Sequence, residues 1–366
     1  MAQTTTTVYY PEPGYDNWER KRPEELGMDS AKLQEAMDFA SAHEAEESRD
    51  IPNTLGTDPI NDHPHNEIIG PTKERTGVNG VITRHGYIAG EWGDTERVDM
   101  TFSVAKSYVS TMAGLAFDKG LIRDVHDLVK DYVDDGGFDS EHNARITWQN
   151  LLQQTSEWEG VLWDKPDMAD RRRGRDRELN EPGTFYEYND VRVNRLALSV
   201  LRVLREPLPE VLKREIMDPI GASDSWEWHG YRNSYVTIDG REMQSVSGGG
   251  HWGGGVWASS FDHARFGYLF LRRGNWGGRQ LISERWVDLA TAPSEREPTY
   301  AYMWWVNPGG ALFPSAPESS FFAVGKGTNL IWVDPKHDLT VVIRWISREH
   351  ADGFIERVLA AINTSS

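Results

Sequence analysis

Strand-like patterns lie near the two ends of this 366-residue chain, while helix-like patterns dominate its middle. Residues 78–93 (VNGVITRHGYIAGEWG) alternate on both sides of a His-Gly pair, which is typical of an antiparallel hairpin. Residues 321–346 read as two further strands joined by a polar turn at 334–338. A sheet made from both ends must place the C-terminal strands beside the hairpin, so we expect an α/β fold interrupted by a helical insertion.

The same patterns suggest domain boundaries. Residues 1–25 are polar and rich in Pro and Thr, and we interpret them as an extended N-terminal arm. We assign residues 26–120 and 300–366 to the α/β domain and residues 121–299 to the helical domain. The expected helices run from Asp29 or Ser30 to Ala42, from Ser103 to about Lys119 with Gly120 as its cap, and over 191–204, 261–272 and 352–362.

Composition excludes several classes of function. The formal charge of -18 disfavours nucleic-acid binding, because such a surface repels phosphate. With no cysteine, disulfides, thiolate catalysis and zinc–cysteine sites are excluded. No apolar run is long enough to cross a membrane and the N-terminus has no secretory signal, so we expect a cytoplasmic protein without membrane contact. The 11 histidines are scattered, so we predict neither a metal nor another cofactor.

The most informative motif is Ser103-Val104-Ala105-Lys106 at a predicted helix start. Residues three apart lie on one helix face, so the hydroxyl and the ammonium are expected to meet. The free N–H groups of the first turn favour an oxyanion there. Alone the pattern is weak, because a helix-capping serine followed by a solvated lysine gives the same letters. Its position after a hairpin favours a nucleophilic serine.

Five blocks follow one another along the chain, namely FSVAKS (102–107), ITWQNLLQQTSEWEG (146–160), PGTFYEYND (182–190), SGGGHWGGGVWASSFDHARFG (247–267) and FFAVGKGTNLIWVDP (321–335). In this order they resemble the serine β-lactamase and penicillin-binding-protein superfamily, and specifically its class C β-lactamase-like branch. That branch includes family VIII esterases, D-amino-acid peptidases and 6-aminohexanoate-dimer hydrolases. The resemblance covers roughly residues 20–362. This resemblance implies a β-lactamase-like antiparallel sheet flanked by helices, with the site in a crevice beside a helical domain.

The resemblance implies a proton shuttle at Tyr188, which matches the tyrosine of the family's Tyr-x-Asn motif. Nearby lysine charge favours the phenolate form, which can accept the Ser103 proton. Asp190 stands where the family usually has asparagine. We expect Asp190 either to contact substrate or to pair with Lys106, and the pairing would weaken the pull of the lysine on Tyr188. Tyr186 is interpreted as a packing aromatic.

The strand that faces the nucleophile in the family carries Lys-Thr-Gly, but here it reads Ala-Val-Gly-Lys-Gly-Thr. Gly325, Lys326 and Gly327 are therefore all candidates for substrate or oxyanion contacts, and Lys326 adds positive charge only if it points inward. Trp158 is interpreted as a pocket wall. Glu157 is expected to recognise a substrate amine or to be solvated.

Two other patterns are given no functional role. The Gly248–Gly253 run matches a dinucleotide fingerprint but follows no predicted strand. The arginine-rich residues 171–177 are interpreted as a solvated loop.

We expect a serine hydrolase that forms an acyl-enzyme on Ser103 and cleaves small esters or amides. An amidase or peptidase acting on D-residues or ω-amino-acid oligomers is the alternative, and the altered Lys-Thr-Gly box favours at most weak β-lactamase activity. A ligand-binding sensor on the same fold is the non-enzymatic alternative. The expected partner is a small molecule, and the oligomeric state stays open.

Overall fold

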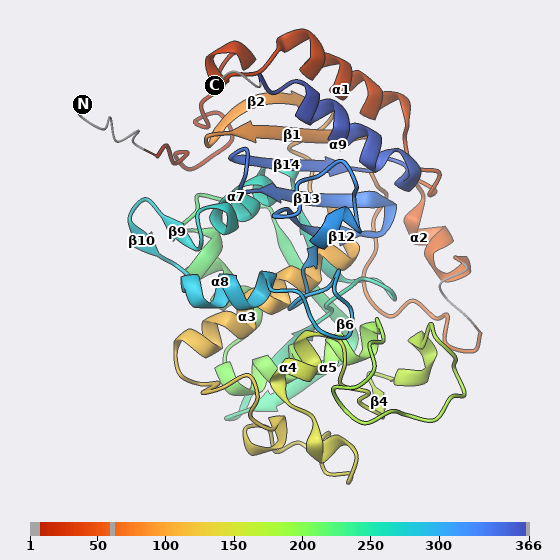
Figure 1. Cartoon of the computed structure of the whole chain (residues 1–366). Helices are drawn as coiled ribbons and strands as arrows, with labels where there is room; N and C mark the ends of the chain where they lie inside the picture. The colour runs from red at the N-terminus through yellow and green to blue at the C-terminus, as the bar shows by residue number, and fades with distance from the viewer. Residues whose placement is uncertain (1–7, 59–62, 364–366) are drawn as a thin grey trace.

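A six-stranded antiparallel sheet joins the two ends of the chain in the computed structural model, which describes residues 8–58 and 63–363 (Figure 1). Its strand order is β11-β12-β13-β14-β1-β2. The strands are β1 (Asn79–Arg84), β2 (Tyr87–Trp92), β11 (Trp305–Val306), β12 (Phe321–Gly325), β13 (Asn329–Asp334) and β14 (Leu339–Arg344). Strand β14 pairs with β1 in the register Val81↔Val342, so the expected closure of the sheet is confirmed.

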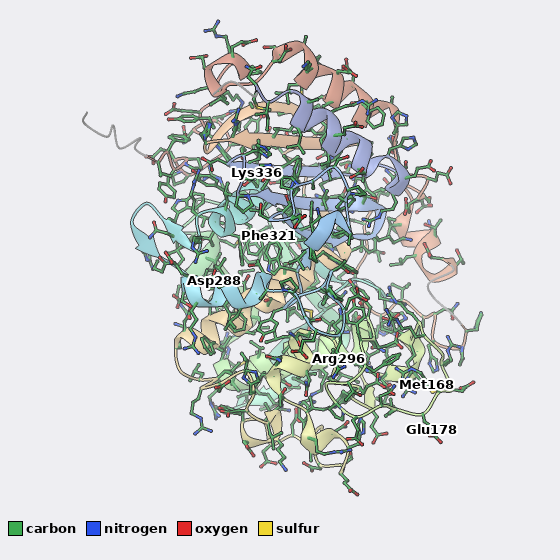
Figure 2. All side chains as sticks on the ribbon, viewed as in Figure 1. Met168, Glu178, Asp288, Arg296, Phe321 and Lys336 are labelled. Carbon is green, nitrogen blue, oxygen red and sulfur yellow. The ribbon has the colours of Figure 1, made fainter. Side chains whose placement is uncertain are left out.

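Helices cover both faces of this sheet (Figure 1). Helices α1 (Ser30–Ala42) and α9 (Ala351–Ala360) pack together on one face, and α7 (Ser260–Leu271) packs on the other. The pleat alternates accordingly, because Leu330 and Trp332 of β13 join the α1/α9 core whereas Ile331 and Val333 join the core that contains α7. Side chains fill the space between these layers (Figure 2).

Local capping explains where several helices begin and end. The Asp29 carboxylate accepts a hydrogen bond from the Lys32 N–H at 3.0 Å, which starts α1 as predicted. Gly120, at φ +70°, follows α3 (Ala105–Asp118) in a left-handed conformation that suits glycine. Helix α7 begins with a capping box between Ser259 and Asp262, one residue earlier than the sequence indicated.

The middle of the chain is less helical than predicted. Strands β6 (Glu227–Ile238) and β7 (Arg241–Val246) form a long hairpin, which joins β8 (Gly255–Ala258) and β3 (Asp99–Met100) in a four-stranded sheet of order β3-β8-β6-β7. The hairpin turns at Asp239 and Gly240, whose φ values of 52° and 78° match a two-residue turn of the type that Asp-Gly favours. The expectation of a mainly helical segment was therefore wrong here.

Helix α7 also connects the middle segment to the main sheet. A β-carbon at Gly267 would lie 2.7 Å from methyl groups of Ile331 and of Thr340, so only glycine allows this close approach of helix and sheet. The predicted 121–299 helical domain thus contributes a covering layer to the α/β half. Its principal helix, α5 (Asp190–Leu204), packs instead against α3 and α4 (Trp148–Leu152).

The remaining elements are short and complete the connections. They are α2 (Ile51–Thr54), α6 (Leu208–Leu212), α8 (Glu284–Thr291), β4 (Val161–Leu162), β5 (Lys165–Pro166), β9 (Asn275–Trp276) and β10 (Arg279–Gln280). The N-terminal arm is described from residue 8 onward; Trp18 within it is buried and donates its indole N–H to the Gly86 carbonyl at 2.7 Å. Among the described residues, no helix combines the length and hydrophobicity needed to cross a membrane.

Candidate active site

Ser103 lies on a tight turn between β3 and α3. A 3₁₀ turn (Phe102–Val104) leads directly into the helix, so Ser103 lies one turn before Lys106. Phe102 has φ 49°, a left-handed conformation that is unfavourable for a bulky residue. Such strain concentrates at functional sites, where the surrounding structure holds it in place.

Lys106 connects Ser103 to the middle segment. Its ammonium donates hydrogen bonds to Ser103 Oγ at 2.9 Å and to Asp190 Oδ1 at 2.6 Å. Lys106 and Asp190 are each only 2% exposed, so the ion pair is shielded from water. The structure thus brings Ser103 and Lys106 together, as the motif indicates. Asp190 was expected either to contact substrate or to pair with Lys106, and the structure contains the pairing with Lys106.

The charges of this pair stabilise each other. Burial alone lowers the pKa of Lys106, but the Asp190 carboxylate and Tyr188 more than offset it, so the pKa of Lys106 lies above its ordinary value. Burial raises the pKa of Asp190, yet the nearby positive charge of Lys106 brings the pKa of Asp190 below its usual range. At neutral pH Lys106 is therefore an ammonium that donates to Ser103, and it cannot accept the serine proton.

The glycine-rich loop packs directly on the ion pair. A β-carbon at Gly249 would lie 2.0 Å from Asp190 Oδ2 and 2.7 Å from Lys106 Nζ, so any side chain there would collide with both. Asp170 supports the pair from the other side by accepting the Asp190 N–H at 2.6 Å. His251, in the same loop as Gly249, places Nδ1 3.5 Å from Asp170 Oδ1.

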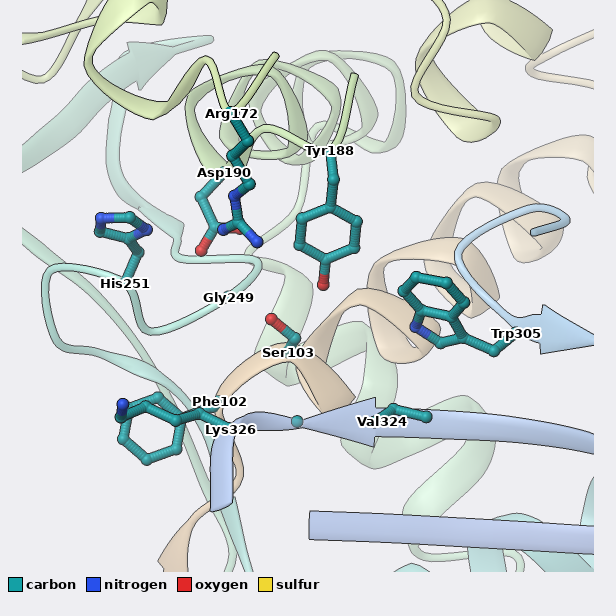
Figure 3. A pocket seen from close by; sticks show the side chains of 11 residues that line it. Phe102, Ser103, Arg172, Tyr188, Asp190, Gly249, His251, Trp305, Val324 and Lys326 are labelled. Atoms are coloured by element: carbon teal, nitrogen blue, oxygen red, sulfur yellow. The ribbon is translucent and has the colours of Figure 1, made fainter. Parts of the chain in front are cut away.

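Tyr188 lies between this charged cluster and an aromatic wall. Its hydroxyl points toward Ser103 (Figure 3). The Lys106 ammonium and the Arg172 guanidinium each lie 4.7 Å from the centroid of the Tyr188 ring. The Trp305 ring stacks near it at a centroid distance of 5.9 Å. Two cations, each paired with a carboxylate, and an indole thus border the Tyr188 ring.

These groups surround a cavity of about 240 Å³ that opens above Ser103 (Figure 3). Trp305 and Val324 lie on one side of Ser103 in this view, and Arg172, Asp190 and His251 lie on the other. The cavity therefore has an apolar side and a charged side. Its lining residues are Phe102, Ser103, Arg172, Tyr188, Asp190, Gly249, His251, Trp305, Val324, Gly325 and Lys326.

The three candidates on the β12 strand have different positions. Gly325 is close to the nucleophile, because a β-carbon there would lie 2.3 Å from the Thr101 carbonyl and 3.2 Å from the Ser103 nitrogen. Lys326 lines the cavity, but its ammonium pairs with Asp58 at 2.5 Å. Gly327 packs against the Trp345 ring and does not line the cavity. Gly325 and Lys326 thus remain candidates for the oxyanion contact, and Gly327 does not.

Trp158 and Glu157 do not line this cavity, so the expectation of a pocket wall at Trp158 is corrected. Glu157 neither contacts the cavity nor is solvated, so both alternatives expected for it are corrected. The Trp158 indole is buried and donates to the Gly137 carbonyl at 2.7 Å, beside a different hollow. Glu157 is fully buried and accepts hydrogen bonds from Arg177 at 2.6 Å and from Arg192 at 2.7 Å. Burial raises the pKa of Glu157, but these two arginines bring it down to about 2.

Sequence reasoning missed Arg172 and His251, both of which line the cavity. The arginine-rich loop was interpreted as solvated, but Arg171 binds Asp167 at 2.7 Å, Arg172 binds Asp170 at 3.1 Å, and Arg177 binds Glu157. The only available signal was an arginine cluster shortly before the Tyr188 motif. Such a cluster by itself does not distinguish a pocket wall from a surface loop.

Comparison with known proteins identifies the family of this chain. A family model described as Beta-lactamase matches residues 66–361, which is most of the chain. The chain belongs to the β-lactamase family. The expected superfamily and α/β fold are thereby confirmed.

Individual relatives are distant. A 6-aminohexanoate-dimer hydrolase from Paenarthrobacter ureafaciens is 23% identical over 277 residues, which cover 70% of this chain and 62% of that relative. A penicillin-binding-protein homologue from Caulobacter crescentus has a similar structure, with a TM-score of 0.61 at 14% identity over 92% of this chain and 99% of the other. A family VIII carboxylesterase has a TM-score of 0.60 at 14% identity with the same coverage. These two structures are similar to this chain in fold.

Proposed function

We propose that this protein is a serine hydrolase that transfers an acyl group from a small carboxylic ester or amide to Ser103 and then to water. The observation that carries the proposal is the 2.9 Å contact between Lys106 Nζ and Ser103 Oγ at the base of an open cavity. A serine hydroxyl held by a buried ammonium and facing a tyrosine hydroxyl is the arrangement that acyl transfer needs.

In the proposed reaction, Tyr188 acts as the phenolate: Ser103 Oγ attacks the substrate carbonyl carbon while its proton passes to the Tyr188 oxygen. Tyr188 then returns the proton to the departing alcohol or amine, which leaves the acyl group on Ser103. Water attacks this ester in the second half, its proton passes through Tyr188 to Ser103 Oγ, and the carboxylic acid is released. Lys106, held as an ammonium by Asp190, stabilises negative charge on Ser103 Oγ and does not itself transfer the proton.

The oxyanion contact is assigned to the backbone. The Ser103 nitrogen lies at the start of a helix and beside the end of β12, where Gly325 permits close approach. We assign one donor to the Ser103 N–H and the second to the N–H of Gly325 or Lys326. No cofactor takes part in this scheme.

Hydrolysis of an ω-amino-acid amide is the second candidate. It is supported by the likeness to a 6-aminohexanoate-dimer hydrolase, although this chain covers only 62% of that relative. Ester and amide cleavage differ mainly in the leaving group, because a departing amine needs protonation more than a departing alcohol does.

A fluorophosphonate probe tests the nucleophile. We expect it to label the wild-type protein and Ser107→Ala, but not Ser103→Ala. Ser107, in the first turn of the helix that follows Ser103, is a matched control, because its buried hydroxyl donates to the Met303 carbonyl at 2.8 Å and does not line the cavity. Equal labelling of Ser103→Ala and wild type, or no labelling at all, would contradict the proposal. Turnover of p-nitrophenyl butyrate and butyryl p-nitroanilide then separates the candidates, since activity on the anilide alone favours the amidase.

A further inference from the structure

The charged side of the cavity contains a cation with no role in the proposed chemistry, namely Arg172. It enters the cavity from the loop before the Tyr188 motif, and its guanidinium points inward beside Tyr188 and Asp190 (Figure 3). Its side chain is 46% exposed, whereas the Lys106 side chain is 2% exposed. Arg172 therefore presents positive charge to whatever occupies the cavity.

The two lysines and the histidine near the cavity are less accessible to a ligand. Lys106 is buried beneath Ser103 and paired with Asp190. Lys326 directs its ammonium to Asp58 at 2.5 Å. His251 is buried and lies against Asp170. Among the described residues that line the cavity, Arg172 is thus the cation whose side chain is substantially exposed.

Asp170 neutralises Arg172 only in part. The Arg172 Nε–H donates to Asp170 Oδ1 at 3.1 Å, and an Nη2–H donates to Oδ2 at 3.5 Å. The same carboxylate also accepts the Asp190 N–H at 2.6 Å and lies 3.5 Å from His251. Its charge is therefore shared among three groups. A guanidinium has five N–H donors in a planar fork, so several donors remain for a second carboxylate.

The position of Arg172 is fixed by the loop around it. The Arg172 backbone N–H donates to Glu187 Oε1 at 2.9 Å, and Glu187 Oε2 accepts from Arg177 at 3.1 Å. The guanidinium also lies against the Tyr188 ring at 4.7 Å. A cation held this way is ready to bind an anion without ordering a flexible side chain first.

We propose that Arg172 is a specificity-determining residue that binds a carboxylate on the substrate. This inference rests on the proposed hydrolase function and narrows it to monoanionic esters or amides, such as half-esters of dicarboxylic acids or acylated amino acids. The reacting carbonyl lies at Ser103, the apolar part of the substrate lies against Trp305 and Val324, and the carboxylate lies on the charged side. A charge-assisted, bidentate contact of this kind favours the anionic substrate roughly tenfold to a hundredfold.

The experiment compares matched anionic and neutral substrates. One set consists of mono-p-nitrophenyl esters of succinic, glutaric and adipic acids, each with its methyl-capped neutral counterpart. A second set, 4-acetoxybenzoate and its methyl ester, places the carboxylate on the leaving group. The measured quantity is the ratio of kcat/KM for the anionic ester to that for the neutral ester. We expect wild type to favour the anion at least tenfold in one set, and added salt to reduce that preference.

The variants are Arg172→Gln and Arg172→Met, with Arg173→Gln as the control. Arg173 carries the same charge on the same loop, but it pairs with Glu297 at 3.4 Å and does not line the Ser103 cavity. We expect both Arg172 variants to lower kcat/KM for the anionic ester more than for the neutral ester and so to bring the ratio close to one, and fluorophosphonate labelling of Ser103 in each variant reports an intact site. Arg172→Met keeps an unbranched side chain beside Tyr188 without the charge, so it carries the test if Arg172→Gln does not fold.

Two results would overturn the inference. One is a wild-type enzyme that shows no anionic preference in any pair, and the other is an Arg172 variant that keeps the wild-type ratio. In both cases neutral-ester turnover and labelling of Ser103 would still report an intact hydrolase. Loss of those two readouts in the wild-type protein would instead refute the proposed function itself.

Discussion

Replacing Asp190 by asparagine tests the buried ion pair on which the site depends. The Lys106 ammonium lies 2.6 Å from Asp190 Oδ1, and both residues are almost fully buried. Removing one partner of such a pair costs about 3–5 kcal/mol, because the other charge stays buried without compensation. Asparagine still offers an oxygen acceptor of the same size, so we expect a loss of about 3 kcal/mol in the free energy of unfolding at pH 7.

The pH dependence of this loss follows from the two pKa shifts. In wild type, the raised pKa of Lys106 stabilises the fold below the ordinary lysine pKa of about 10.4, and the lowered pKa of Asp190 stabilises it above the ordinary aspartate pKa of about 3.9. Both contributions are thus present at pH 7. In Asp190→Asn, burial dominates and lowers the pKa of Lys106, so the unfolded state binds more protons and the variant becomes more stable as pH rises.

Urea unfolding, followed by tryptophan fluorescence, measures these free energies at pH 6, 7.5 and 9. We expect the difference between wild type and Asp190→Asn to be largest at pH 6 and to narrow by pH 9. The double variant Lys106→Met/Asp190→Asn should lose about 1–3 kcal/mol less than the sum of the single losses, since it leaves no buried charge. The reasoning would be refuted if Asp190→Asn were as stable as wild type at pH 6, or if the difference in unfolding free energy between them widened with pH. It would also be refuted if the losses of the two single variants simply added in the double variant.

Three further predictions concern Tyr188, Gly325 and Glu157. Tyr188→Phe should lower kcat at least about 100-fold, whereas the control Tyr186→Phe should keep kcat within a small factor of wild type. Equal kcat values for Tyr188→Phe and wild type would remove Tyr188 from the mechanism. Gly325→Ala places a methyl group 2.3 Å from the Thr101 carbonyl, so kcat should fall up to about 100-fold, unlike the control Gly353→Ala, whose nearest contact is 3.4 Å. Glu157→Gln should reduce the free energy of unfolding by about 3 kcal/mol at pH 7. The pKa of Glu157 is about 2, so its ionised carboxylate stabilises the fold above the ordinary glutamate pKa of about 4.3, and this stabilisation shrinks as pH falls. If Glu157→Gln lost the same unfolding free energy at pH 3 as at pH 7, the role given to the carboxylate would be contradicted.

Local signals were sufficient for the α/β half of the fold. The caps of α1 and α3 and the alternation in β1, β2, β13 and β14 depend on neighbours within a few residues. The β6–β7 hairpin was missed although its Asp239-Gly240 turn was a usable signal. The helical prediction for this region came from the periodicity of residues 121–290, which does not separate the hairpin from its helical neighbours.

Spacing and motif order predicted only part of the site. Ser103 and Lys106 meet because they lie one helical turn apart, and Asp190 opens the helix that follows the Tyr188 motif. The orientation of Trp158 toward Gly137 depends on long-range packing, which one sequence does not encode in any local pattern. Arg172 is held both by Asp170, two residues away in the sequence, and by Glu187, 15 residues away, and the second contact has no local pattern either.

The central claim is that Ser103 carries the acyl group during turnover. Its most direct test is to quench the protein in acid during hydrolysis of p-nitrophenyl butyrate and to measure the mass of the intact chain and of its peptides. We predict a butyryl adduct on the peptide that contains Ser103, with no adduct in Ser103→Ala. Turnover that proceeds in Ser103→Ala, or an adduct on any other residue of the wild-type protein, would contradict the account.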